Sequence, residues 1–411
     1  MHTELAEFLM NTPEGQEAKD IVGRCVHCGF CTATCPTYQL LGDELDSPRG
    51  RIYLMKQVLE GQAVTEKTQL HLDRCLSCRN CETTCPSGVE YGRLVDVGRK
   101  IVDDQVPRPW THKLVRTALK EGLTSPLFAP AMKLGQWFRP LLPETLKNKV
   151  PAAQDSGTWP QRPHATRVLL LAGCVQPAML PNINSATARV LDALQIQTLV
   201  ADKAGCCGAI RYHLNDHAGG LDDMRRNIDA WWPWVEQGVE AIIMNASGCG
   251  ATVKEYGHKL RHDPQYAERA ARISAMTYDV SEYLLPHVAR LQSLLSLSKT
   301  GSMVFHPPCT LQHGQKMKGV VEDLMTRLGF GVSVPAEGHL CCGSAGTYSV
   351  LQPKLAYELR DRKLAAIEQV CPNPDTPVAS ANIGCITHLQ SGTQRQLLHW
   401  IELIDAALVD D

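Results

Sequence analysis

The sequence predicts a multidomain chain of the α plus α/β class, with a mostly helical N-terminal domain followed by two copies of an α/β unit with parallel strands. Two features of the 411 residues support this prediction. One cysteine pattern occurs twice near the N-terminus, and a different one occurs twice in the second half, among alternating strand-like and helix-like segments. We expect four segments, at residues 1–106, 107–166, 167–298 and 299–411.

The first segment contains two cysteine runs of the form C-x2-C-x2-C-x3-C-P. In two-cluster ferredoxins this spacing binds two [4Fe–4S] clusters, and the fourth cysteine of each run ligates the cluster of the other run. Zinc sites use paired C-x2-C units instead, and disulfides are typical of secreted chains. The pattern therefore predicts a ferredoxin-type domain that transfers electrons. We expect cluster 1 on Cys25, Cys28, Cys31 and Cys85, and cluster 2 on Cys75, Cys78, Cys81 and Cys35.

One helix is expected between the two runs. Ser47 is a favourable N-cap, Pro48 suits the first helical position, and Gly61 suits the end of the helix. Such a helix would space the two runs within one compact unit. Two interpretations of Arg49 and Arg51 on this helix stay open. They lower the electrostatic cost of charged clusters, or they are ordinary solvated residues.

Composition and charge exclude several classes of protein. The formal net charge is −2 and the pI is about 6.7, which argues against a nucleic-acid-binding surface. The start, MHTELAEFLMNTPEG, lacks the basic and apolar regions of a secretory signal, and the sequence has no run of 18 apolar residues. The 17 cysteines then indicate metal binding in a reducing compartment. We expect a soluble or peripheral protein on the cytosolic side.

The second cysteine pattern consists of a single cysteine, a C-C-G triplet, and a last cysteine that follows a glycine. Its two copies indicate duplication of a structural unit. Each copy opens with an apolar run, at 168–171 or 303–305, and continues with a helical pattern, at 185–195 or 319–329. The cysteines are Cys174, Cys206, Cys207 and Cys249 in the first repeat, and Cys309, Cys341, Cys342 and Cys385 in the second.

Two further strands are expected in each repeat, at 197–201 and 241–244 and at 331–336 and 377–380. Strand–helix–strand units of this length predict a parallel sheet. The cysteines then follow the C-terminal ends of strands, which is the edge where open α/β sheets bind ligands. We expect the four thiols of a repeat to converge on one site.

Three interpretations of these C-C-G cysteines stay open. They are small buried apolar residues, ligands of an iron–sulfur cluster or another metal in at least one repeat, or a redox-active or remnant thiol site. His306 and His313 flank Cys309 and are either ligands or structural residues. Cys371 lies in a turn-rich stretch, and we expect no role for it.

Residues 107–150 differ in composition from both halves. Basic side chains outnumber acidic ones there and alternate with Trp, Phe and Leu. A basic amphipathic segment of this kind lies on an anionic membrane surface, or its helices pack between domains or on a partner subunit. Residues 151–166 read as a linker.

The sequence lacks a G-x-G-x-x-G motif after a strand and lacks a P-loop. We therefore expect no flavin or nicotinamide site on this chain. Since iron–sulfur clusters accept electrons singly, a partner would have to oxidise the substrate.

The chain resembles the iron–sulfur subunits that serve flavin-dependent respiratory dehydrogenases and heterodisulfide reductases, and within that group those of bacterial glycolate oxidase. The resemblance rests on segments such as CVHCGFCTATCPTYQ, CLSCRNCETTCPSG, AGCCGAIRYHLN, FHPPCTLQH and LCCGSAGTYSV. It implies a hetero-oligomeric complex in which flavoprotein subunits oxidise glycolate to glyoxylate at FAD. Electrons would pass through this chain to a membrane acceptor, expected to be quinone, on the cytoplasmic face of the inner membrane.

The resemblance also leaves questions open. Related C-C-G repeats often end in C-x-x-C, whereas Ala246 and Asn382 stand at the earlier of those positions here. Each repeat thus has four cysteines, so a five-thiolate cluster is not expected. The alternatives in function are the equivalent subunit for glycerol 3-phosphate or lactate, a heterodisulfide-reductase-like catalytic subunit, and a scaffold that docks a flavoprotein.

Overall fold

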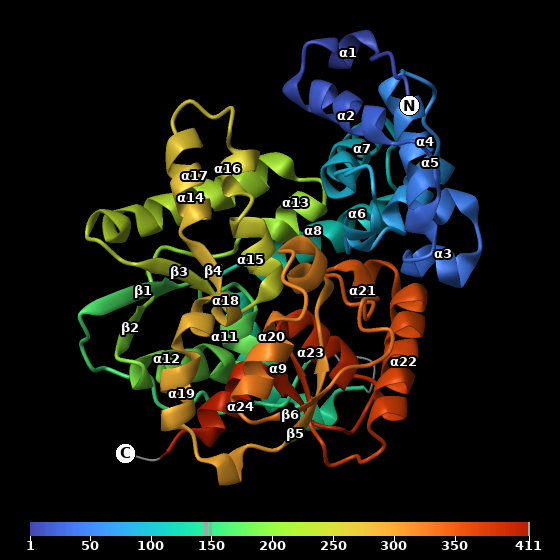
Figure 1. The fold of residues 1–411 in the computed structure, drawn as a ribbon. Coiled ribbons are helices and arrows are strands. Elements are labelled where there is room, and N and C mark those ends of the chain that lie inside the picture. Colours follow the sequence, from blue (N-terminus) through green and yellow to red (C-terminus); the bar gives the residue numbers. More distant parts are fainter. Residues whose placement is uncertain (144–146, 148–149, 410–411) are drawn as a thin grey trace.

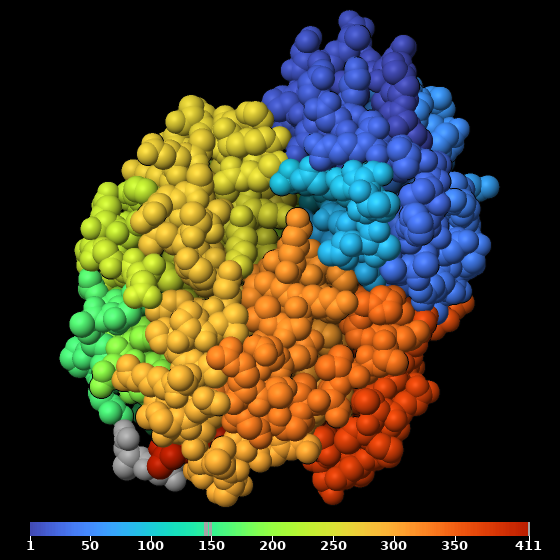
Figure 2. Space-filling view, viewed as in Figure 1, coloured from blue at the N-terminus to red at the C-terminus, as the bar shows by residue number. Residues whose placement is uncertain are grey.

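The computed structural model describes residues 1–143, 147 and 150–409. Residues 144–146 and 148–149, within the basic stretch expected at 107–150, lie outside this description, as do the last two residues. An N-terminal helical domain rests on one side of two α/β units, which share one body (Figure 1, Figure 2). The predicted fold class is confirmed.

The N-terminal domain is built around a core of helices. The predicted helix is confirmed as α4 (Pro48–Leu59), and the Ser47 hydroxyl accepts the Gly50 N–H at 3.0 Å. Buried side chains of α4 pack on those of α2 and α7, with Met55 and Leu94 at the centre. The elements are α1 (Glu7–Met10), α2 (Pro13–Arg24), η1 (Phe30–Thr32), α3 (Pro36–Leu41), η2 (Glu44–Asp46), α4, α5 (Glu66–Asp73), α6 (Asn80–Thr84) and α7 (Tyr91–Gln105).

Both repeats contain a four-stranded parallel sheet with the same strand order, which confirms the duplication. The first sheet has the order β2-β1-β3-β4 and the second the order β6-β5-β7-β8. The strands are β1 (Thr166–Leu170), β2 (Ile196–Leu199), β3 (Ala241–Met244), β4 (Thr277–Asp279), β5 (Ser302–His306), β6 (Gly331–Ser333), β7 (Val378–Ser380) and β8 (Leu397–His399).

The edge strands β4 and β8 were not predicted. Each has three residues, and each has a polar residue at its end that caps the next helix. Asp279 caps α18 (Val280–Leu284) and His399 caps α24 (Trp400–Ala407), each in a capping box. A strand of three residues is too short to show the alternation of apolar and polar residues from which strands are predicted, so its sequence cannot be told from the start of the next helix.

Helices cover both sheets and join the two repeats. Trp400 and other residues of α24 share one hydrophobic core with residues of the first sheet, and Arg189 and Asp405 form an ion pair at 2.6 Å across the junction. The first repeat contains α11 (Gln176–Met179), α12 (Asn182–Ala193), α13 (Ala209–His213), α14 (His217–Glu236), α15 (Ser247–Val253), α16 (Tyr256–Lys259), α17 (Ala267–Ala275), α18, η4 (Leu285–His287) and α19 (Val288–Leu294), and η5 (Leu297–Lys299) follows it. The second contains the π-helical turn η6 (Thr310–Gly314), α20 (Val320–Arg327), α21 (Tyr348–Leu351), α22 (Pro353–Val370), α23 (Ile383–Gln390) and α24.

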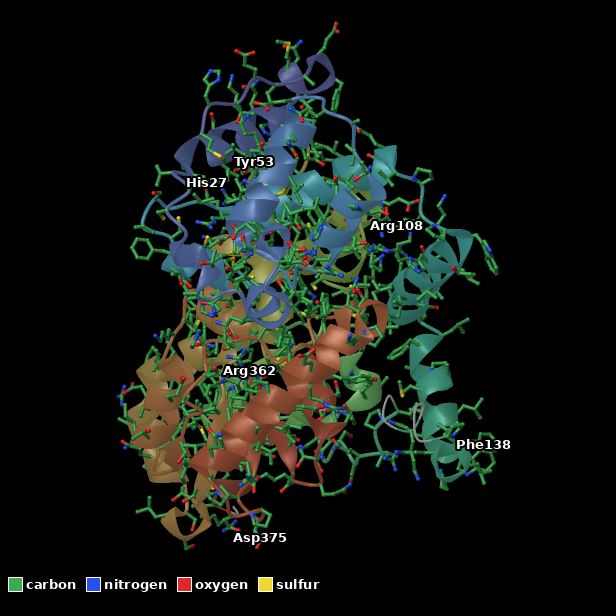
Figure 3. The ribbon with its side chains drawn as sticks, turned by 90° about the vertical axis from the view of Figure 1, so that its right-hand side faces the viewer. His27, Tyr53, Arg108, Phe138, Arg362 and Asp375 are labelled. Atoms are coloured by element: carbon green, nitrogen blue, oxygen red, sulfur yellow. The ribbon has the colours of Figure 1, made fainter. Side chains whose placement is uncertain are left out.

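The connector forms α8 (Trp110–Thr124), α9 (Phe128–Trp137) and η3 (Arg139–Leu141). Arg116 of α8 pairs with Asp73 at 3.2 Å, and Glu121 pairs with Arg211 of the first repeat at 2.7 Å. Helix α8 therefore contacts both the N-terminal domain and the first repeat. Figure 3 shows the connector along one side of the molecule, from Arg108 to Phe138 at its outer edge. Within the described part of the chain, no helix combines the length and the apolar character needed to cross a membrane.

Candidate iron–sulfur centres

The two cysteine runs have the same backbone shape. His27 and Gly29 lie in the left-handed region with φ of 57° and 85°, and Ser77 and Arg79 occupy the equivalent places with φ of 53° and 59°. Such turns direct successive N–H groups toward one point, which favours a negatively charged group there. Three of these four residues carry a Cβ, which strains a backbone in this region. The surrounding structure must therefore hold both turns in place.

The structure brings the four cysteines predicted for cluster 1 together. They line a pocket of about 430 Å³, whose wall also includes Ile52, Tyr91 and Cys81. Cys25 is buried and Cys28 is exposed, so the pocket opens to the surface. Burial raises the pKa of the Cys31 thiol to about 11, and the neighbouring Cys25 adds to this effect. A thiophilic cation that replaces the protons would relieve that cost. The four residues are Cys25, Cys28, Cys31 and Cys85.

The outer wall of this pocket is apolar. Val26 and Phe30, which lie between the cysteines, are 68% and 63% exposed. His27 packs edge-on against Tyr53 of α4, with ring centroids 6.4 Å apart, and Figure 3 shows both on the outer face of the domain. The first cysteine run thus presents a small apolar surface directly beside an exposed cysteine.

The four cysteines predicted for cluster 2 lie deeper, where the N-terminal domain meets the repeats. Arg51 of α4 is 1% exposed, and its Nη1 lies 3.9 Å from the Cys35 sulfur. Burial opposes a thiolate at Cys75, but the guanidinium groups of Arg51 and Arg99 outweigh it and lower the pKa of that thiol. Burial and neighbouring thiols instead raise the pKa of Cys78 and of Cys81.

The structure distinguishes the two arginines whose roles were open. Arg51 is not a solvated residue, because it bonds to the His71 carbonyl at 2.7 Å and pairs with the buried carboxylate of Asp46 at 3.1 Å. Arg49 is partly exposed and pairs with Glu44 at 2.5 Å. The charge beside the second cysteine group therefore comes from Arg51 and not from Arg49.

In the first C-C-G repeat, four thiols form a continuous chain of contacts at the end of the sheet. Cys206 contacts Cys174 and Cys207, and Cys207 contacts Cys249. The thiols of Cys174 and Cys207 donate hydrogen bonds to Cys206 and lower its pKa, and backbone N–H groups contribute to this shift. The four cysteines are therefore one group, as predicted.

The second repeat has the same chain of contacts from Cys309 through Cys341 and Cys342 to Cys385. The Cys309 and Cys341 sulfurs are 4.0 Å apart. The glycine of the triplet, Gly343, has φ of 89°, and a Cβ there would lie 2.3 Å from a backbone oxygen of α22. Glycine is thus required for the turn that aims two adjacent cysteines at one place.

Asn382 stands three residues before Cys385, the last cysteine of the second repeat. Its amide Nδ2 lies 3.7 Å from the Cys385 sulfur, and its Oδ1 accepts the Gly248 N–H at 3.3 Å. The side chain thus contacts the thiol as a neutral hydrogen-bond donor. In the first repeat, the small apolar Ala246 is buried at this position.

The second repeat packs directly on the second cysteine group. Cys78 shares a small hydrophobic cluster with Cys309 and Cys341, and its pKa is raised by burial and by Cys309. Asn80 of α6 donates to the His339 carbonyl at 3.1 Å, and Tyr348 of α21 donates to the Arg74 carbonyl at 3.0 Å. Sequence reasoning missed this junction, which joins residues more than two hundred positions apart.

The two histidines that flank Cys309 differ. His313 bonds to Thr83 at 2.9 Å and to the His339 carbonyl at 3.0 Å, so it holds the N-terminal domain on the second repeat. His306 instead lies with Cys342 and Cys385, all three buried and with their ligand atoms within 4.8 Å of one another. Cys371 follows the end of α22, and its pKa is lowered by Thr376 and Arg395.

Comparison with known proteins agrees with this arrangement. Residues 21–89 match the family described as 4Fe-4S dicluster domain, and residues 168–254 and 303–390 match the cysteine-rich domain. The chain is 52% identical over 413 residues to the glycolate oxidase iron-sulfur subunit of Escherichia coli, with 99% of each chain covered. It belongs to the family of glycolate oxidase iron–sulfur subunits. Members of this family are electron-transfer subunits of an oxidoreductase complex.

Two more relatives show how far the family likeness extends. The probable glycolate oxidase iron-sulfur subunit of Bacillus subtilis is 30% identical, with 90% of this chain and 89% of that protein covered. Lactate utilization protein A of Geobacillus thermodenitrificans is 24% identical over 245 residues, which cover 58% of this chain and 98% of that protein.

Proposed function

We propose that the chain carries electrons in a glycolate dehydrogenase complex. A flavoprotein subunit oxidises glycolate to glyoxylate at FAD, and the electrons pass through this chain to a membrane acceptor, quinone. The observation that carries the proposal is the pair of four-cysteine groups, one at the surface and one at the junction with the second repeat. The relative from Escherichia coli supports glycolate as the substrate.

Cys25, Cys28, Cys31 and Cys85 hold cluster 1 in this proposal, and Cys75, Cys78, Cys81 and Cys35 hold cluster 2. Iron–sulfur clusters suit these sites because soft thiolates are their usual ligands and the two runs share one backbone shape. The thiols supply the ligands, the left-handed turns supply N–H groups, and Arg51 and Arg99 supply positive charge at cluster 2.

Electrons enter at cluster 1. Its pocket opens to the surface and is bordered by the exposed side chains of Val26 and Phe30, which form a suitable contact for the flavoprotein. The electrons continue to cluster 2, because Cys81 of the second run also lines the cluster 1 pocket. Both cysteine groups belong to the N-terminal domain, so this electron transfer stays within one domain.

Substitution at cluster 1 tests the proposal. In the purified complex, Cys28→Ser should leave the flavin reducible by glycolate and abolish quinone reduction. Cys371→Ser, which lies outside the cysteine groups, is the control and should retain both activities. Quinone reduction at the wild-type rate by a correctly assembled Cys28→Ser complex would contradict the proposal. Parallel assays with lactate and glycerol 3-phosphate identify the substrate of the same complex.

We also propose that the connector holds the complex at the cytoplasmic face of the inner membrane. Trp110, Trp137 and Leu141 are 74%, 76% and 80% exposed along α8, α9 and η3. Lys113 and Lys133 lie exposed on the same two helices. Exposed aromatic and aliphatic side chains with nearby lysines fit an anionic lipid surface.

A further inference from the structure

His306 is the last residue of the central strand β5 and lies beside Cys342 and Cys385 of the second repeat. It is 1% exposed. Among the residues that the structure describes, neither its Nδ1 nor its Nε2 has a hydrogen-bond partner. A buried imidazole without a partner is costly, because both polar atoms have lost their water. The imidazole is stabilised when a ligand, such as a metal ion, binds one of its ring nitrogens.

Two thiols face this imidazole. Ligand atoms of His306, Cys342 and Cys385 lie within 4.8 Å of one another. Two thiolate sulfurs on one tetrahedral ion lie about 3.8 Å apart, since the Zn–S distance is about 2.3 Å. The spacing of the three groups therefore suits ligands of a single ion. Cys341 contacts Cys342 and is placed to supply a fourth ligand.

The four thiols of the second repeat do not share one environment. Cys309 and Cys341 pack with Cys78 in the small cluster at the domain junction. Cys342 and Cys385 belong to the large core that runs between the two sheets. The imidazole lies on the core side with Cys342 and Cys385, and Cys341 contacts both Cys309 on the junction side and Cys342 on the core side.

A buried cation is also near these thiols. Lys363 of α22 is 2% exposed, its ammonium group donates to the Glu337 carbonyl, and the charges of Cys341, Cys342 and Cys385 act on it. Three thiolates and one divalent ion carry a net charge of −1. The ammonium group of Lys363 neutralises such a site in the interior, where an unbalanced charge is disfavoured.

The first repeat lacks this arrangement. Leu171 is the counterpart of His306, since each residue stands three positions before the first cysteine of its repeat. His306 ends β5, and Leu171 directly follows β1. Leu171 is also buried, at 4% exposure. The fold thus accepts an aliphatic side chain at this place, so packing alone does not require histidine in the second repeat.

We propose that the second repeat binds one thiophilic divalent metal ion, Zn²⁺ or Fe²⁺, through His306, Cys342, Cys385 and Cys341. Thiolates with one imidazole are ligands that both ions accept. Binding releases the three thiol protons to solvent. The ion is separate from the two ferredoxin-type clusters, and it fixes the core of the second repeat beneath the junction with cluster 2.

The test is metal analysis of the purified complex together with EPR of the reduced clusters. The wild type should contain about one metal ion per chain beyond the iron of the clusters, and elemental analysis distinguishes zinc from iron. His306→Leu, which copies Leu171 of the first repeat, should lose that ion and keep the EPR signals of both clusters. His306→Cys should retain the ion, with X-ray absorption at the metal edge showing sulfur in place of nitrogen.

His313→Leu is the matched control, because His313 also flanks Cys309 but bonds to Thr83 and a backbone carbonyl. It should keep the ion. A folded His306→Leu complex with unchanged zinc and iron would overturn the proposal, and so would a wild type without metal beyond the clusters. These outcomes do not depend on the substrate of the complex, so they leave the proposed function untouched.

Discussion

The guanidinium group of Arg51 lies 3.9 Å from the sulfur of Cys35 and is closed off from solvent. It is held there by Asp46, which also accepts a hydrogen bond from Arg74 at 2.8 Å. A fixed positive charge beside a cluster stabilises the reduced form, which carries one more electron. The two cysteine groups therefore differ in electrostatics although their sequences are alike, because the guanidinium group at the second is buried, whereas that of Arg49 at the first pocket is partly exposed.

We predict that Arg51→Gln makes the reduction potential of cluster 2 more negative and slows electron transfer from cluster 1. EPR-monitored redox titration measures this shift. The loss of a partner for buried Asp46 should also lower the free energy of unfolding by about 1–3 kcal/mol. Arg49→Gln is the control for cluster 2, since Arg49 pairs with Glu44 and lines the cluster 1 pocket, and the potential of cluster 2 should stay at the wild-type value in this variant. Equal potentials in both variants would refute the role of Arg51.

The contact between Arg79 and Glu255 gives a second prediction. The Arg79 Nη2 lies 3.0 Å from Glu255 Oε2, and this ion pair joins the second cysteine run to the first repeat. Arg79 also has φ of 59°, at the place where the first run has glycine. Arg79→Ala and Arg79→Gly both lose the pair, but the glycine variant relieves backbone strain. We expect Arg79→Gly to be more stable than Arg79→Ala by about 1 kcal/mol in urea unfolding.

A double-mutant cycle with Glu255→Gln separates the two effects. The pair should contribute a coupling energy of about 1–2 kcal/mol between Arg79 and Glu255. The advantage of glycine over alanine should persist in the Glu255→Gln background, because backbone strain does not depend on the partner. If Arg79→Gly and Arg79→Ala were equally stable in the Glu255→Gln background, the backbone conformation at residue 79 would carry no strain energy.

The sequence predicted the duplication and the helix that begins after Ser47 because local signals determine both. Cysteine spacing and a capping serine act over a few residues. It did not predict that Cys78 lies beside Cys309 and Cys341, since this contact depends on how the N-terminal domain docks. No periodicity or motif records docking between segments so far apart in the chain.

The charge pattern of the connector likewise did not show which of its basic residues form ion pairs. From the sequence alone, the basic residues of the connector fit either a membrane surface or a packing partner. In the structure Arg116 pairs with Asp73, and Lys120 pairs with Asp216 at 2.9 Å. Their partners lie outside the connector, and local composition cannot identify them. Within the connector, the structure separates basic residues that join domains from the exposed Lys113 and Lys133.

Buried histidines predict a pH dependence of stability. Burial lowers the pKa of His217 to about 4, and its ring stacks on Tyr212 with centroids 4.0 Å apart. The unfolded chain binds this proton near pH 6.5 and the folded chain does not. Stability from this residue is therefore complete above pH 6.5 and decreases as the pH falls toward 4, by up to about 1 kcal/mol per pH unit.

His217→Phe should reduce this slope between pH 7.5 and 5.5 in urea unfolding, since phenylalanine can stack on Tyr212 without a proton. A residual slope is expected because burial lowers the pKa of His399 to about 3. His262→Phe is the control, since His262 is an exposed residue of the first repeat, and should leave the slope unchanged. A slope in His217→Phe equal to that of the wild type would assign the acid sensitivity elsewhere.

The exposed side of the connector gives the last prediction. Combined substitution of Trp110 and Trp137 by serine should weaken binding of the complex to vesicles that contain anionic lipids, because each Trp loses a large apolar contact. Lys113→Glu with Lys133→Glu should weaken binding mainly at low salt, since about 1 kcal/mol per lysine is screened as ionic strength rises. Soluble electron acceptors should be reduced at the wild-type rate by both variants. Vesicle sedimentation measures the effect, and wild-type binding by both variants would contradict a membrane role for the connector and favour a protein partner on this surface.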